Sequence, residues 1–364
     1  MPGNQLPKGY QPQQKTPFQM AEHYGFPVGQ YTGKGQKVAI LIFGAPITAS
    51  EIEADLAAYG VNDENITIKV VDDRVNPNPG VQQTTEVHLD AETIGSICPD
   101  AQITIYYSRN NNTSYPAYFD AALADGNSVI SMSFGAPEYS GIETIDCFEK
   151  AANAGVTICA ASGDDGSRND DNDGRAHVNF PSSSPYVVAC GGTMIDGAGT
   201  EVVWNLEAEQ EGAGGGGVSD YFAVPSWQQK DAANITSANP GGGVGRVVPD
   251  VAGLAAPGDW VIELDDGTQK EVVGGTSAVT PMMAAFFTLV NQARAEAGKG
   301  PIGFVNEKLY GLSPRSGYFN DITEGDNKPT PSYPGYDAMS GFDACSGLGS
   351  PKGDTLFKAL VSMD

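Results

Sequence analysis

The amino-acid sequence predicts an α/β fold built on a parallel sheet with helices on its flanks. The run at 37–43 is apolar almost throughout, as expected of a strand that is buried on both faces. After it, stretches with helical periodicity alternate with short apolar stretches, and repeated βα units of this length are typical of parallel sheets. The predicted strands are 37–43, 66–71, 103–107, 128–133 and 156–160, and the predicted helices are 50–59, 84–97, 117–124, 142–154, 277–297 and a last one from 354.

Three segments lack this periodicity. The first thirty or so residues are rich in Pro, Gln and Gly and are expected to lie as an arm over the domain. The middle segment, 163–220, is predicted to be rich in loops, and the tail, 313–350, is rich in Gly, Pro, Ser and Asp. Ser50 is expected to cap the helix at 50–59. Because no internal repeat and no long linker is found, residues 1–364 are predicted to form a single domain.

The composition excludes several classes of protein. Forty-five acidic residues against twenty basic ones give a net charge of −25 and a pI near 4.3, so binding to nucleic acid is not expected. The charge has two interpretations: solubility, or activity in acid, where protonation of carboxylates relieves repulsion. Five cysteines without a C-x-x-C motif favour neither a disulfide framework nor a zinc site. No apolar run is long enough to predict a membrane span.

The N-terminal residues lack the apolar core of a signal peptide. Two expectations follow and stay open at this point. Either the protein is cytosolic, or the sequence is a mature form from which targeting and pro segments are absent.

The most specific motif surrounds Ser277. It reads Gly-Gly-Thr-Ser-Ala-Val-Thr-Pro at 274–281 and precedes the apolar stretch 282–290. The serine falls in the first turn of a predicted buried helix, where free N–H groups and the helix dipole support negative charge. Pro281 is expected in or near that first turn, where proline is tolerated. The motif resembles the active-site serine motif of subtilisins, and Ser277 is predicted to be a nucleophile.

A serine nucleophile needs a base, and the histidines do not provide one in the expected setting. They are His23, His88 and His177, and none has the sequence surroundings of a subtilisin histidine. Glu86 and Asp90 are four residues apart on a predicted helix, so both carboxyl groups project from one face. Two such groups in a partly buried cleft share a proton or raise one pKa. Glu86 is therefore predicted to be the general base, oriented by Asp90, at a site suited to acid conditions.

Taken together, the motifs resemble those of the sedolisin family of serine-carboxyl peptidases, in particular kumamolisin-like members. The resemblance covers nearly the whole chain and rests on Glu86-x-x-x-Asp90, Ala-Ser-Gly-Asp at 161–164, the serine motif, Asp-Ile at 321–322 and Gly-Phe-Asp at 341–343. It implies a subtilisin-like fold with a C-terminal calcium-binding loop region. It also implies a secreted, monomeric endopeptidase that acts at acid pH on extended or denatured polypeptides through an acyl-enzyme. Such enzymes are made with an N-terminal propeptide that serves as inhibitor and folding aid.

The resemblance also assigns roles to individual residues. Asp164 corresponds to the aspartic acid of the oxyanion hole, with Asp165 as the neighbouring alternative. One Ca²⁺ ion would be bound by carboxylates and backbone carbonyls, whose chemistry suits this hard cation. The implied calcium ligands are the carboxylates of Asp321 and Asp343 and the carbonyls of Ile322, Met339 and Gly341. The implied substrate-binding residues are Ser133, Phe134, Gly135, Asn179 and Gly275.

Two departures from the family pattern carry expectations of their own. Ile42 and Phe134 stand where relatives extend the Glu–Asp pair with a further Glu and a Trp, which predicts an altered pH profile or a lower rate. Asn179 stands where relatives can carry an acidic residue, so a preference for basic P2 residues is not expected.

Two alternative functions remain open on the sequence. One is a subtilisin-type hydrolase that uses a displaced histidine. The other is a catalytically impaired, calcium-stabilised binding protein on the same fold.

Overall fold

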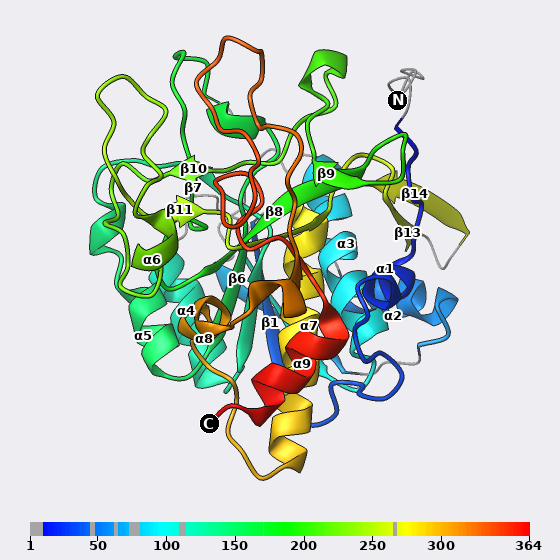
Figure 1. Cartoon of the computed structure of the whole chain (residues 1–364). Coiled ribbons are helices and arrows are strands. Elements are labelled where there is room, and N and C mark those ends of the chain that lie inside the picture. Colours follow the sequence, from blue (N-terminus) through cyan, green and yellow to red (C-terminus); the bar gives the residue numbers. More distant parts are fainter. Residues whose placement is uncertain are drawn as a thin grey trace.

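Parallel strands form the centre of the molecule (Figure 1). The computed structural model describes residues 10–43, 48–61, 65–72, 81–108, 114–169, 171–264 and 268–364, and of residues 81–84 only the backbone. In these ranges the main sheet has the order β12-β8-β6-β4-β1-β3-β2, all parallel, and β9 (Glu201–Val203) pairs antiparallel with β8. The parallel strands are β1 (Lys37–Phe43), β2 (Ile66–Asp72), β3 (Gln102–Ser108), β4 (Val129–Met132), β6 (Thr157–Ala161), β8 (Val188–Ile195) and β12 (Val251–Leu254).

Helices cover both faces of this sheet, as the sequence predicts. Helices α3 and α7 pack on one face, together with α1, α2 and α9, and α4 and α5 pack on the other (Figure 1). Strand β1 shows the division: Val38, Ile40 and Ile42 enter one apolar core, and Ala39 and Leu41 enter the other. The helices are α1 (Pro17–His23), α2 (Ala49–Ala58), α3 (Val81–Ile97), α4 (Tyr115–Ala124), α5 (Cys147–Asn153), α6 (Gln229–Ala232), α7 (Thr276–Glu296), α8 (Asn306–Gly311) and α9 (Gly353–Ser362).

Short antiparallel strand pairs form separate two-stranded sheets outside the main sheet. They are β5 (Ala136–Pro137) with β7 (Asn179–Phe180), β10 (Gly217–Val218) with β11 (Val247–Val248), β13 (Trp260–Leu264) with β14 (Gln269–Val273), and β15 (Phe319–Asn320) with β16 (Ser350–Pro351). The larger apolar core extends from Tyr10 to Leu360, so both ends of the described chain pack on it. In the described part of the chain, no helix combines the length and apolar character that crossing a bilayer requires.

The structure corrects three local expectations. Thr48, not Ser50, caps α2, because its hydroxyl and the Glu51 carboxylate form a reciprocal capping box. The N-terminal arm contains the helix α1, which begins at a second capping box between Thr16 and Gln19. The segment predicted to be rich in loops contributes the interior strand β8.

The glycines inside β8 explain why the sequence predicts a loop where the structure has this strand. A Cβ atom on Gly191 would lie 2.5 Å from Pro249 Cγ, and one on Gly192 would lie 2.7 Å from the Trp204 ring. Close packing on both faces therefore requires glycine here, although glycine weakens the sequence signal for a strand.

Candidate active site

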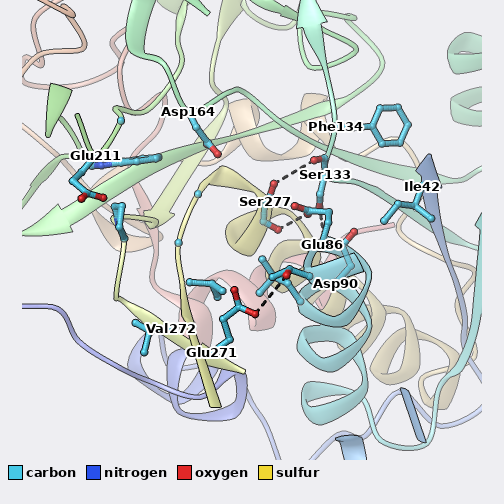
Figure 2. A pocket seen from close by; sticks show the side chains of 18 of the residues that line it. Ile42, Glu86, Asp90, Ser133, Phe134, Asp164, Glu211, Glu271, Val272 and Ser277 are labelled. Atoms are coloured by element: carbon cyan, nitrogen blue, oxygen red, sulfur yellow. Dashed lines mark hydrogen bonds between the residues drawn. The ribbon is translucent and has the colours of Figure 1, made fainter. Parts of the chain in front are cut away.

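A cleft of about 740 Å³ opens at the carboxyl ends of β1, β4 and β6, the edge at which parallel sheets bind their ligands. Ser277, Glu86, Asp90 and Asp164 all line it, although they come from α7, α3 and the loop after β6. Figure 2 shows Glu86 and Asp90 beside Ser277, and Asp164 approaching from another side. The structure thus brings together the four residues that the sequence singles out for catalysis.

Ser277 is the second residue of α7, as the motif predicts. Gly275 caps the helix with a φ of 99°, and a Cβ atom at this position would lie 2.7 Å from Asp164 Oδ2. Glycine is therefore required both for the left-handed backbone and for the close approach of Asp164. The Ser277 hydroxyl donates to the carbonyl oxygen of Ser133 at 3.2 Å, and it lies near enough to the Glu86 carboxyl group to lower the pKa of that group (Figure 2).

Pro281 lies deeper in α7 than the sequence suggests. It is the sixth residue of the helix, so it stands in the second turn and not in or near the first. Proline has no N–H group, and the carbonyl oxygen four residues earlier, that of Ser277, consequently loses its helical partner. The Ser133 hydroxyl lies 3.3 Å from that oxygen.

Glu86 and Asp90 form a buried carboxyl pair. Glu86 Oε1 and Asp90 Oδ2 are buried and meet no protein donor among the described residues. Burial, followed by the charges of Asp90 and Asp164, raises the pKa of Glu86 well above its usual value, and the hydrogen bond from Ser277 opposes this rise. Burial raises the pKa of Asp90 to about 7, against hydrogen bonds from Ser133 and Glu86. A hydrogen bond between two carboxyl groups requires a proton, so the contact between the two groups forms only when the pair holds at least one proton.

Asp164 faces the cleft with one carboxyl oxygen bound to Thr276. Its Oδ1 atom accepts the Thr276 N–H at 2.7 Å and the Thr276 hydroxyl at 2.8 Å. Burial nevertheless dominates and raises the pKa of Asp164. Because Oδ1 already accepts two donors, a proton on this group belongs on Oδ2, the atom beside Gly275. Asp165 instead pairs with Arg168 at 3.2 Å and does not line the cleft.

The histidines lie elsewhere. None of the three is among the described residues that line the cleft. His88 is on α3 but pairs with the buried Asp55 at 2.7 Å, beside Glu92, and His177 pairs with Asp173 at 2.9 Å. His88 therefore joins α3 to α2 and leaves the catalytic face of α3 to the two carboxyl groups.

The predicted substrate-binding residues are only partly brought together. Ser133, Phe134 and Gly275 line the cleft, whereas Gly135 and Asn179 are not among the lining residues. Gly135 stands against Asn179, since a Cβ atom on this glycine would lie 3.3 Å from that of Asn179.

Ile42 and Phe134 line the cleft on the side of the buried carboxyl pair (Figure 2). The Phe134 ring packs edge-on against Phe43 with ring centroids 4.5 Å apart, and it stacks on Tyr115. Both side chains are apolar, so neither offers the carboxyl pair a hydrogen-bond partner.

The calcium ligands implied by the sequence lie on one loop of the tail. The Asp321 carboxylate accepts the N–H of Gly341 at 2.9 Å, and the Asp343 carboxylate accepts the N–H of Met339 at 3.1 Å. Burial raises the pKa of Asp343. The two carboxylates thus hold the segment 339–341, which carries two of the three backbone carbonyls expected to bind the ion, those of Met339 and Gly341.

The cleft also contains residues that sequence reasoning misses. Glu271 and Val272 come from β14, and Trp204 and Glu211 come from the segment after β9. Glu271 is 3.4 Å from the Thr85 hydroxyl, next to Glu86. The sequence has an Asp-Gly turn signal at 266–267, but no motif that would place the β13–β14 hairpin at the cleft before the fold is known.

Comparisons with known proteins agree with this architecture. The model of the subtilase family, peptidase family S8, matches residues 54–302. The chain is 41% identical to kumamolisin of Bacillus sp. (strain MN-32), over 95% of this chain and 63% of that protein. It is 30% identical to tripeptidyl-peptidase 1 of Canis lupus familiaris, over 76% of this chain and 52% of that protein. The chain therefore spans about half to two thirds of the length of these relatives.

Among solved structures, a sedolisin from Pseudomonas, described as a serine-carboxyl proteinase, matches with a TM-score of 0.77 and 25% identity, over 97% of this chain and 99% of that one. The agreement extends over the sheet, the flanking helices and the tail. By sequence and by structure, the chain belongs to the subtilase family and, within this fold, to the kumamolisin-like sedolisins.

Proposed function

We propose that the protein is an acid-active serine-carboxyl endopeptidase that hydrolyses peptide bonds in extended or denatured polypeptides. One observation carries the proposal: the Ser277 hydroxyl, at the start of α7, lies beside Glu86 of a buried carboxyl pair, in a cleft without an imidazole among its described residues (Figure 2). This arrangement places a nucleophile and a proton acceptor side by side.

In the first step, Ser277 Oγ attacks the peptide carbonyl carbon, and its proton passes to Glu86. The carbonyl oxygen becomes an oxyanion, which neutral Asp164 stabilises by donating a hydrogen bond from Oδ2. The C–N bond then breaks, and the leaving amine takes the proton from Glu86. The products of this step are an acyl-enzyme ester on Ser277 and a free amine.

In the second step, water attacks the ester and gives its proton to Glu86, and the proton returns to Ser277 as the acid product leaves. Asp90 supports both steps because it accepts or releases the shared proton of the pair. Asp164 must be protonated and the Glu86–Asp90 pair must hold a charge, so activity belongs to a window of acid pH.

Further properties are proposed from the family. We propose that the protein is secreted, works as a monomer and is made as a zymogen whose propeptide inhibits it and aids folding. The Pseudomonas relative is recorded in complex with pseudo-iodotyrostatin. An inhibitor of that kind is therefore a suitable probe of the Ser277 site.

We also propose that the tail binds one Ca²⁺ ion. The support is chemical: Asp321 and Asp343 anchor one segment from both sides, and carboxylate and carbonyl oxygens suit this cation. An ion there would order a loop that has little regular secondary structure of its own.

The proposal is tested by measuring kcat/KM between pH 2 and 8 on a denatured protein substrate. Native protein is expected to show an optimum below pH 5. Ser277→Ala is expected to abolish activity, and Glu86→Gln is expected to lower it by about 10²–10⁴-fold, the usual contribution of a general base.

Two results would contradict the proposal. An optimum above neutrality that disappears in His88→Gln or His177→Gln would indicate a subtilisin-type hydrolase instead. A well-folded protein that neither cleaves the substrate nor reacts with an aldehyde inhibitor at Ser277 would indicate an impaired binding protein.

A further inference from the structure

The side chain of Ser133 joins the two catalytic elements. Ser133 follows β4 and is 8% exposed. Its hydroxyl lies 2.7 Å from Asp90 Oδ1 on α3 and 3.3 Å from the carbonyl oxygen of Ser277 on α7 (Figure 2). Its own carbonyl oxygen faces the Ser277 hydroxyl at 3.2 Å. The residue therefore contacts the nucleophile and the carboxyl pair at the same time.

A hydroxyl group has one proton to donate and can also accept a hydrogen bond. Two acceptors compete for the proton of Ser133: Asp90 Oδ1 and the Ser277 carbonyl oxygen. The latter is available because Pro281, four residues later in α7, has no N–H group to offer it. The shorter contact goes to Asp90, so the hydroxyl donates there when Asp90 is charged.

The surroundings leave few other groups that could serve Asp90. Its side chain is fully buried, and the nearby Ile42 and Phe134 side chains offer no polar atom. The titratable groups that face the pair are Glu86 on the same helix, Asp164 after β6 and, at the rim beside Thr85, Glu271 on β14. None of these is a cation. Ser133 is the hydroxyl donor to Asp90 among the described residues.

We propose that Ser133 is a positioning residue whose hydroxyl stabilises the ionised form of Asp90. With Asp90 ionised, the hydroxyl donates to Oδ1. With Asp90 protonated on its other oxygen, Oδ2, the hydroxyl still donates to Oδ1, but this hydrogen bond is no longer charge-assisted. Both protonation states of the pair then keep this hydrogen bond, and the proton can move between Glu86 and Asp90 without leaving Oδ1 unpaired.

This inference rests on the proposed function and has a directional consequence. When the hydroxyl is removed, ionised Asp90 loses a charge-assisted hydrogen bond. Neutral Asp90 loses only an ordinary hydrogen bond. Charge-assisted bonds are about twice as strong, so the loss favours the protonated pair. A doubly protonated pair has no base, and the acid limb of the pH profile must therefore move to higher pH.

The experiment compares kcat and KM from pH 2 to 7 for the native protein, Ser133→Ala and Ser133→Thr. Ser133→Ala is expected to move the acid limb of kcat up by about one pH unit and to lower kcat at the optimum about tenfold. KM is expected to stay within about twofold. Ser133→Thr restores a hydroxyl at the same position and is expected to return the limb toward the native value.

Ser131→Ala is the matched control. Ser131 lies on β4, is fully buried, and its hydroxyl has no hydrogen-bond partner among the described residues. Its loss removes a buried hydroxyl from the same strand without touching Asp90, and the native pH profile is expected. Melting temperatures of all variants show that each is folded.

The outcomes separate the two ideas. If the native protein shows no acid activity, the proposed function fails first. The native protein can be active while the acid limb of the kcat–pH profile of Ser133→Ala stays where it is in the native protein, or while only KM rises. In either case Ser133 serves substrate binding or the fold, and this inference is wrong. An equal shift in Ser131→Ala would likewise overturn it.

Discussion

At the scale of single residues, the site depends on where protons rest on carboxyl groups. Asp164 illustrates this, because Thr276 supplies two donors to Oδ1 and thereby leaves Oδ2 to carry a proton. An aspartic acid in this state offers the same kind of donor to an oxyanion as an amide does. The proposed role requires Asp164 to be protonated, and an oxyanion hole of this kind would therefore work only at acid pH.

Asp164→Ala is expected to lower kcat by about 10²–10³-fold, the usual effect of losing one oxyanion-hole donor. KM should change much less, because the donor acts on charge that develops in the transition state. Asp165→Asn is the control, since Asp165 points to Arg168 and does not line the cleft. Steady-state kinetics at pH 4 check both. A larger loss in Asp165→Asn would show that the oxyanion role belongs to the neighbour.

The residues that can be predicted from the sequence are those whose roles depend on local spacing. Glu86 and Asp90 meet because a helix brings i and i+4 to one face, and Ser277 faces the cleft because its motif begins a helix. The role of the Ser133 side chain could not be predicted, since it depends on the distance between a strand end and two helices. The same is true of Glu271, which reaches the cleft on a hairpin far from the other lining residues.

At the scale of elements, α3 has two polar faces with different tasks. One presents Glu86 and Asp90 to the cleft, and the other buries His88 and Glu92 against Asp55 of α2. The second face fixes the rotation of the helix about its axis, so the pairing of His88 serves the site indirectly. Helix α7 was predictable from its long apolar run, whereas β8 was not, because its glycines are required by packing that only the fold reveals.

The tail between β15 and β16 is the element for which we predict a metal effect. Addition of Ca²⁺ to chelator-treated protein is expected to raise the melting temperature, and a concentration of about 100 times Kd corresponds to about 2.7 kcal/mol. Asp321→Ala is expected to abolish this rise. Asp337→Asn is the control in the same tail, because Asp337 is largely exposed and pairs with Lys328. Differential scanning calorimetry checks the prediction, and an unchanged response in Asp321→Ala would remove the assigned site.

At the scale of the whole molecule, acidity affects the fold as well as the site. The net charge is −25 at neutral pH, so protonation of carboxylates lowers the repulsion within the folded state. Several buried carboxyl groups also favour the folded state at acid pH. Burial raises the pKa of Asp90 to about 7, that of Glu92 to about 8 and that of Asp259 to about 6. Each value lies above that of an unfolded chain, near 4.

The sign of the effect follows from proton binding. Between about pH 4 and pH 8 the folded protein holds protons on these groups that the unfolded chain has lost, so stability falls as pH rises through this window. Their contribution is fully present below the unfolded values and is lost as pH passes the folded ones. We therefore expect a higher melting temperature at pH 4 than at pH 7.5. Thermal unfolding followed by circular dichroism in matched ionic strength checks this.

Glu92→Gln isolates one part of this dependence, because it removes a titrating group away from the cleft. The amide oxygen can still accept the N–H of Glu263, which Glu92 Oε2 accepts at 2.9 Å, so the fold should be retained. At pH 4 the variant is expected to have the same melting temperature as the native protein. At pH 7.5 the variant is expected to melt at a higher temperature than the native protein. A native protein that gains stability from pH 4 to 7.5, or a variant with an unchanged slope, would contradict the assignment. In either case the preference for acid would reside in the catalytic carboxyl groups alone.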